Sequence, residues 1–170
     1  MADSFVASVA IDNQDNKWFG TYGFYNDLIN DLIHGGVSKF DGKEWTTYIT
    51  SNSGLVVNGI NAIAIDAQDN KWFGTNHGVS KFDNTRWTTY TTASGLVSDY
   101  VWVIEIDKQG NIWFGTTDGG VSKFDGKEWT TYNTSNSGLV DNGIKAIAID
   151  AQDNKWFGTI HGVSKFDNTG

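Results

Sequence analysis

Three histidines stand before glycine at equivalent points of a repeated sequence, and histidine is well suited to acid–base or metal chemistry near neutral pH. They are His34, His77 and His161, and Asp118 takes the same place in a further copy. Imidazoles and a carboxylate are a ligand set that zinc accepts. Equivalent points of neighbouring sheets lie about 10 Å apart or more, so one ion could not reach them all. We therefore expect no metal and no cofactor, and the four residues are either ordinary turn residues or the polar rim of a ligand pocket.

A second candidate is a position near the start of the first strand of each repeat, which differs in every copy although its neighbours are uniform. Its residues are Ala7, Asn61, Trp102 and Lys145. We expect this position to face a central channel near its upper rim. There Trp102 could stack on a sugar ring, and Asn61 and Lys145 could donate hydrogen bonds. The alternative, in which Trp102 packs against an inserted segment, stays open.

The inserted segment, residues 22–34, does not repeat and holds the only, faint helical period of the chain. Long loops on rigid scaffolds often carry function. Its aromatic residues could cap a pocket or contact a partner, and its aliphatic residues could pack down or bind another chain. These are Tyr22, Phe24 and Tyr25, and Leu28, Ile29, Leu32 and Ile33. The expected ligand-binding residues are Tyr22, His34, Asn61, His77, Trp102, Asp118, Lys145 and His161.

An acidic turn also recurs four times, at 12–16, 66–70, 107–111 and 150–154. Carboxylates in a loop suggest calcium, but the ligand spacing of a calcium loop is absent. We expect the aspartates to accept hydrogen bonds from the backbone of their own turn.

The elements that must position these residues follow from one phrase, Asp-x-x-x-Asn-x-Trp-Phe-Gly-Thr. It is centred on Trp18, Trp72, Trp113 and Trp156, and its period is about 42 residues outside the insertion. Each unit holds four short runs rich in β-branched and aromatic residues, as at 60–65, 71–75, 78–82 and 86–91. Asp-Gly or Asp-Asn pairs between the third and fourth runs indicate hairpin turns. Four short strands at this period are typical of a β-propeller blade, and a β-sandwich is the alternative.

We therefore predict an all-β fold, a β-propeller of four tandem four-stranded blades in one domain over residues 1–170. The expected blades are 5–50 with the insertion at 22–34, 59–92, 100–134 and 143–170. The last blade lacks its outer strand, so we expect a second copy of the chain to complete a ring of about eight blades. Residues 35–85 recur almost unchanged at 119–169, and a fragment of a longer protein or an engineered array stays an open alternative.

The composition of the chain disfavours some classes of binding partner. The net charge is -8 and the sequence pI about 4.6, which disfavours nucleic acid and anionic membrane because both require clusters of basic residues. The chain contains no cysteine. No secretory signal is visible at its start.

The repeated phrase, followed by Gly-Val-Ser-Lys-Phe-Asp, Trp-Thr-Thr-Tyr and Ser-Gly-Leu-Val, resembles the two-component regulator propeller repeat. That resemblance implies a sensor domain of a hybrid two-component system, placed in the periplasm or outside the cell, and many such domains sense carbohydrates. We expect a non-catalytic module that binds a carbohydrate or another small polar ligand. A self-assembling structural protein and, more remotely, a propeller lyase are the alternatives.

Overall fold

The chain folds into four antiparallel sheets and one small hairpin. The computed structural model describes residues 5–26, 31–33 and 35–167. Blade 1 contains β1 (Phe5–Ile11), β2 (Lys17–Tyr22), β5 (Gly36–Phe40) and β6 (Trp45–Tyr48). Blade 2 contains β7 (Ile60–Ile65), β8 (Lys71–Thr75), β9 (Gly78–Phe82) and β10 (Trp87–Tyr90). Blade 3, after the short helix η1 (Thr92–Ser94), contains β11 (Val101–Ile106), β12 (Ile112–Thr116), β13 (Val121–Phe124) and β14 (Trp129–Tyr132). Blade 4 contains β15 (Ile144–Ile149), β16 (Lys155–Thr159) and β17 (Gly162–Phe166).

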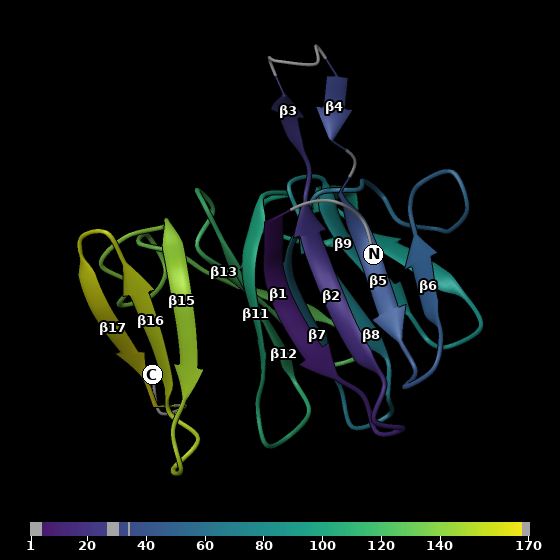
Figure 1. Ribbon diagram of the computed structural model, residues 1–170. Helices are drawn as coiled ribbons and strands as arrows, with labels where there is room; N and C mark the ends of the chain where they lie inside the picture. Colours follow the sequence, from purple (N-terminus) through teal and green to yellow (C-terminus); the bar gives the residue numbers. More distant parts are fainter. Residues whose placement is uncertain (1–4, 27–30, 34, 168–170) are drawn as a thin grey trace.

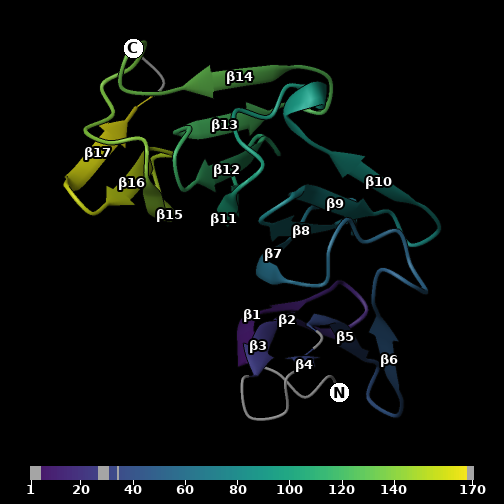
Figure 2. The same ribbon diagram turned by 90° about the horizontal axis from the view of Figure 1, so that it is seen from above.

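The sheets follow one another around an arc, each packed against the next (Figure 2). The first strands β1, β7, β11 and β15 lie on the inside of the arc and contact one another in sequence. The fourth strands β6, β10 and β14 lie on the outside. This is the predicted propeller, with three strands in the last blade. Whether a second copy completes a ring remains a proposal.

Hairpin turns join the third and fourth strands as the Asp-Gly and Asp-Asn pairs predict. Gly42, Asn84 and Gly126 adopt positive φ angles of 95°, 74° and 97°, a conformation that glycine and asparagine tolerate best. Asp41 Oδ1 accepts hydrogen bonds from the backbone N–H groups of Lys43 and Glu44. The turns therefore define the order of strands within each blade.

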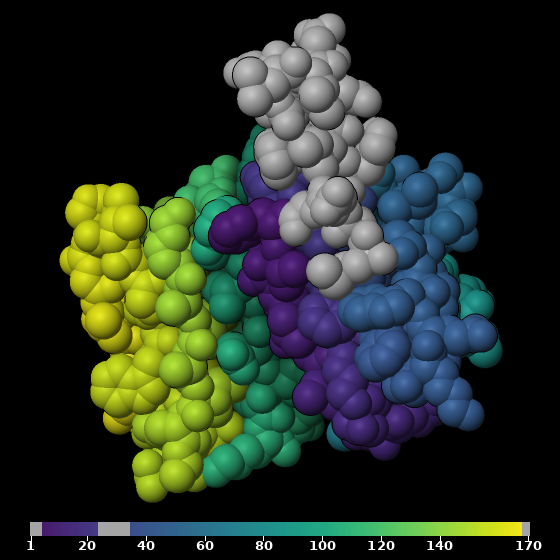
Figure 3. Space-filling model, viewed as in Figure 1, coloured from purple at the N-terminus to yellow at the C-terminus, as the bar shows by residue number. Residues whose placement is uncertain are grey.

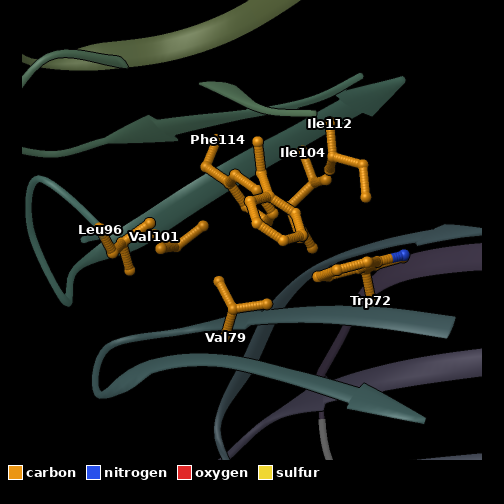
Figure 4. Close-up of a cluster of buried hydrophobic side chains, with 9 residues drawn as sticks. Trp72, Val79, Leu96, Val101, Ile104, Ile112 and Phe114 are labelled. Carbon is orange, nitrogen blue, oxygen red and sulfur yellow. The ribbon is translucent and has the colours of Figure 1, made fainter. Parts of the chain in front are cut away.

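The core consists of three interfaces between successive blades. Each blade has a Trp face, which carries the Trp of its second strand and the Val of its third strand. Each blade also has a Phe face, which carries the Phe of its second strand and two aliphatic residues of its first strand. The Trp face of each blade packs on the Phe face of the next one, and a leucine from the connecting loop fills the gap. Figure 4 shows this packing between blades 2 and 3, with Trp72 and Val79 opposite Val101, Ile104 and Phe114.

The glycine of each Trp-Phe-Gly-Thr phrase lets the next blade approach. A Cβ atom at Gly20 would lie 2.5 Å from Ile60 Cγ2, one at Gly74 would lie 2.9 Å from Val101, and one at Gly115 would lie 2.7 Å from Ile144. Such contacts are too short for carbon atoms, so glycine leaves the space that these side chains of the next blade occupy.

Each acidic turn is held by hydrogen bonds to its own aspartate. Asp12 Oδ1 accepts hydrogen bonds from the N–H groups of Gln14 and Asn16, and Oδ2 accepts one from Trp18 Nε1 at 2.9 Å. The corresponding aspartates in the other three blades bind their own tryptophans in the same way. The expectation that these aspartates bind their own turn is confirmed, and they also fix the tryptophan ring.

A buried lysine crosses two of the three interfaces. Lys71 Nζ donates to Asp69 Oδ2 at 2.8 Å, lies 3.5 Å from Asp12 Oδ2 of the preceding blade, and stands 5.3 Å from the centroid of the Trp18 ring. Lys155 repeats this arrangement with Asp107 and Trp113. Blade 3 has Ile112 at this position, and its side chain is part of the hydrophobic core.

The insertion does not follow the faint helical period of its sequence. The described part of this segment is a hairpin of β3 (Phe24–Asn26) and β4 (Asp31–Ile33), whose backbone projects beyond the end of blade 1 (Figure 1). In its register Phe24 lies opposite Ile33 and Asn26 lies opposite Asp31. Leu28 and Ile29 lie outside the described residues.

Lys71→Ala should lower the free energy of unfolding by about 3 kcal/mol, because it leaves the buried Asp12 carboxylate with one partner fewer and a gap beside Trp18. Lys71→Ile should cost less, because it recreates the side chain that blade 3 uses. Lys43→Ala, at an exposed position, is the control and should change stability by less than about 0.5 kcal/mol. Urea denaturation measures all three, and equal losses for Lys71→Ala and Lys43→Ala would refute the role of the buried charge.

Acid should destabilise the fold in a defined range. Burial would raise the pKa of Asp12, but hydrogen bonds from Asn16 and Trp18 outweigh it and lower the pKa to about 2. Hydrogen bonds from Asn154 and Trp156 lower the pKa of Asp150 to about 2. Both folded-state pKa values lie below the usual 3.8. The stabilisation of the fold by these two ionised carboxylates is therefore present above about pH 4 and is lost as the pH falls to about 2. Thermal melting followed by circular dichroism should show this decline, and a melting temperature that stays constant across this range would contradict it.

Candidate functional site

The position that varies among the four copies is a β-bulge in each blade. The register between the first and second strands shifts once, between Val6 and Ser8 in blade 1, and at the equivalent points of the other three blades. The skipped residues are Ala7, Asn61, Trp102 and Lys145. A bulged residue has no partner in the ladder, and its side chain is turned away from the regular alternation. The backbone therefore presents four different side chains at one level of the channel.

Three of these bulges border one hollow. It has a volume of ≈ 330 Å³ and is lined by Phe5, Ala7, Tyr22, Asn61 and Trp102. These residues come from the first three blades, and aromatic rings form most of the wall. A space of this size is at the lower end of what small-molecule sites occupy. Of the predicted ligand-binding residues, the structure thus brings together Tyr22, Asn61 and Trp102.

A chain of hydrogen bonds fixes the polar wall of this hollow. Asn61 Nδ2 donates to Asn76 Oδ1 and to the Val101 carbonyl, both at 2.8 Å, and Asn76 Nδ2 donates to the Tyr22 hydroxyl at 3.2 Å. Asn61 Oδ1 is buried without a partner, the one such side-chain atom found in the described part of the chain. An unpaired buried acceptor costs about 1–3 kcal/mol, so it calls for a specific reason.

The Asn61–Asn76 pair also distinguishes two nearly identical segments. Residues 60–85 and 144–169 differ only at Asn61, which is Lys145 in the second copy, and at Asn76, which is Ile160. The two residues that differ in blade 2 are the two that bond to each other. Since blade 4 forms the same strands without them, the fold of a blade does not require this pair.

The fourth bulge extends the site on the other side of Trp102. Lys145 Nζ lies over the Trp102 ring, 5.2 Å from its centroid, a geometry that a cation–π interaction stabilises. The Trp102 side chain nevertheless remains 42% exposed. The ring is therefore held in place by the lysine while a large part of its surface stays open to solvent.

The remaining predicted residues lie elsewhere. His77 lines a neighbouring hollow of ≈ 290 Å³, which shares Tyr22 with the first one and is also lined by Asn76. Asp118 lines a third hollow beside Tyr100. His161 Nδ1 contacts Asp141 Oδ2 on blade 4, and His34 lies outside the described residues. His77, His161 and Asp118 do not converge, and no group of three or more His, Cys, Asp or Glu with metal-binding geometry was found in the described ranges.

Reasoning from the sequence missed three residues of this region. Phe5 is predicted to lie at the start of blade 1, but nothing in the sequence indicates that it forms a wall of the hollow. Asn76 was visible as a difference between the copies, but its contact with Asn61 was not. Glu105 replaces the alanine of the other first strands and lines the channel with Ala10 and Ala64. Burial raises the pKa of Glu105 above its usual value.

The main hollow presents groups that can bind a polar ligand. The residues that line it offer an exposed aromatic ring, an amide and a phenol. An aromatic plane with amide and hydroxyl groups at its edge is complementary to a sugar ring.

Comparison with known families gives one match. A family model described as two component regulator propeller matches residues 95–118, which contain the central phrase of blade 3. No curated protein sequence matches the chain. Within the described residues, no helix has the length and hydrophobicity needed to cross a bilayer.

Solved structures share the fold over almost the whole chain. The extracellular domain of BT3049 from B. thetaiotaomicron, described as a hybrid two-component system, is 25% identical with a TM-score of 0.82, over 99% of this chain and 22% of its own. PorZ from Porphyromonas gingivalis is 15% identical with a TM-score of 0.64, over 95% of this chain and 32% of that one. Virginiamycin B lyase from Staphylococcus aureus is 14% identical with a TM-score of 0.69, over 96% of this chain and 56% of that one. The family match and the likeness to BT3049 confirm the resemblance drawn from the repeats, and the chain spans less than a quarter of that neighbour's length.

Proposed function

We propose that this chain, a propeller of the two-component regulator type, is a non-catalytic sensor module that binds a neutral carbohydrate in the hollow beside Trp102. The observation that carries the proposal is the Asn61–Asn76 pair beside an exposed tryptophan. The pair is absent from an otherwise identical copy of the same segment, so the blade itself does not account for it.

The chemistry of the hollow supports a sugar over other small ligands. The face of Trp102 can cover the C–H groups of a pyranose ring, and the Tyr22 hydroxyl and Asn61 amide lie along the same wall. The buried Asn61 oxygen has no donor, and a sugar hydroxyl would supply one after a small rotation of the amide. A net charge of -8 disfavours anionic ligands.

A sensor role and a position outside the cytoplasm agree with the comparisons. The solved neighbour BT3049 is an extracellular domain, and an extracellular or periplasmic module would meet carbohydrates there. The likeness to virginiamycin B lyase rests on 14% identity and supports a common fold alone. We therefore do not extend lyase chemistry to this chain.

Replacing both members of the pair by the residues of blade 4 tests the proposal. Asn61→Lys combined with Asn76→Ile should keep the fold, because blade 4 forms the same strands with these residues. It should weaken binding of neutral di- and trisaccharides at least about tenfold, since it removes the Asn61 amide from the wall and the Asn76 amide that bonds to it. Saturation-transfer NMR on a sugar panel identifies the ligand, and calorimetry then measures affinity.

Two single variants serve as a matched pair in the same assay. Trp102→Ala should weaken sugar binding about tenfold through loss of stacking. Tyr100→Ala removes an aromatic side chain of similar exposure that lines a different hollow and should leave affinity unchanged. The proposal fails if no neutral sugar in the panel binds at millimolar concentration, or if both variants lose affinity equally.

A further inference from the structure

The two end blades expose the same side chains that the inner blades bury. Val163 on the Trp face of blade 4 is 67% exposed, whereas Val37, Val79 and Val121 at the equivalent positions are 0% exposed. Trp156 on the same face is 38% exposed, against at most 2% for the other three tryptophans of the phrase. On the Phe face of blade 1, Val9 is 55% exposed, against 8% for Ile63. Each end of the arc therefore has an apolar face that no other blade covers among the described residues.

These two faces are the two halves of one interface. Within the chain, a Trp face packs on a Phe face three times. Blade 4 offers the Trp face, and its residues 150–159 are identical to residues 66–75 of blade 2, which already make such an interface. Blade 1 offers the Phe face, with Val6, Val9 and Phe19 in place of Ile60, Ile63 and Phe73. A Trp face and a Phe face without neighbours are complementary to each other.

The glycine of blade 4 gives an independent sign of a missing neighbour. A Cβ atom at Gly20, Gly74 or Gly115 would collide with the first strand of the next blade. At Gly158 it would meet only Ala146 of its own blade, at 3.5 Å or more. The space that an incoming first strand fills at the inner interfaces is thus open on blade 4.

The charged groups of the inner interfaces recur at both ends. Lys17 Nζ is held by Asp15, as Lys71 is held by Asp69, and both Lys17 and Asp15 are partly exposed. Asp150 binds Trp156 Nε1, as Asp12 binds Trp18 Nε1. An incoming blade 1 would bring Lys17 to Asp150 and over the Trp156 ring, as Lys71 meets Asp12 and Trp18.

We propose that a second copy of this chain docks the Phe face of its blade 1 on the Trp face of blade 4, and that the reciprocal contact closes a two-copy ring. The shape of the arc favours closure. In Figure 3 blade 4, in yellow and lime, and blade 1, in purple, lie on either side of a recessed segment in teal, as expected for sheets arranged around an arc. The docked copy places the bulge residue Ala7 beside the bulge of Lys145, which completes the row of bulge side chains around the channel.

Light scattering after size exclusion tests the ring with the full chain. The wild-type protein should have twice the 18.7 kDa mass of one chain. Gly158→Val should remain folded, because among the described residues only Ala146 of blade 4 lies within 4 Å of a Cβ atom at that position, but its side chain would occupy the space of the incoming strand. Val9→Asp places a charge on the opposite face at an exposed position. In each variant the dissociation constant of the dimer should rise at least about 100-fold, and the protein should elute as a monomer.

Mixing the two variants separates this arrangement from any other. Gly158→Val retains an intact Phe face, and Val9→Asp retains an intact Trp face, so the mixture should regain a species of two chains through one junction. Circular dichroism melts confirm that both variants are folded. A wild-type chain that is monomeric at micromolar concentration, assembles beyond two copies, or gives variants whose mixture stays monomeric overturns the proposal.

Discussion

The packing of one blade's tryptophan face on the next blade's phenylalanine face is the interaction on which the rest of this structure depends. A four-stranded sheet has two apolar faces and cannot cover either by itself. Here Trp18 of one blade and Phe73 of the next meet with Leu55 between them, and the same contact recurs twice along the chain. The buried Lys71 adds a charge contact across that interface. Stability therefore comes from nearest neighbours, as in other repeat proteins.

The proposed binding site uses positions that this packing leaves free. The bulge at the start of each first strand lies outside the ladder, so its side chain can change without cost to the blade. Asn61 and Trp102 occupy two such positions, and together with Tyr22 they line one hollow. A rigid frame with a few variable side chains on one rim is an arrangement that binding proteins of unrelated sequence also use.

Much of the fold follows from the repeats, because residues that recur in all four copies are the ones that the structure of a blade requires. The four sheets, the hairpin turns at Gly42 and Asn84, and the structural role of Asp12 were all predictable. The hairpin of the insertion was not, since a segment without a copy gives only a weak periodic signal. The hydrogen bond between Asn61 and Asn76 could not be predicted from the sequence either. It joins a residue of the bulge to a residue of a loop across the register shift, and the spacing of residues along the chain does not indicate such a contact.

Hydrogen exchange of the β2 and β16 amides, followed as a function of protein concentration, tests the central claim most directly. If a sheet is stable only when both faces are covered, β8 and β12 of the inner blades should be protected at every concentration. Protection of β2 and β16 should be low in dilute solution and should rise toward that of β8 and β12 as the chain associates. Equal protection of all four strands in dilute, monomeric protein would contradict the account, because a sheet with one bare face would then be as stable as a covered one.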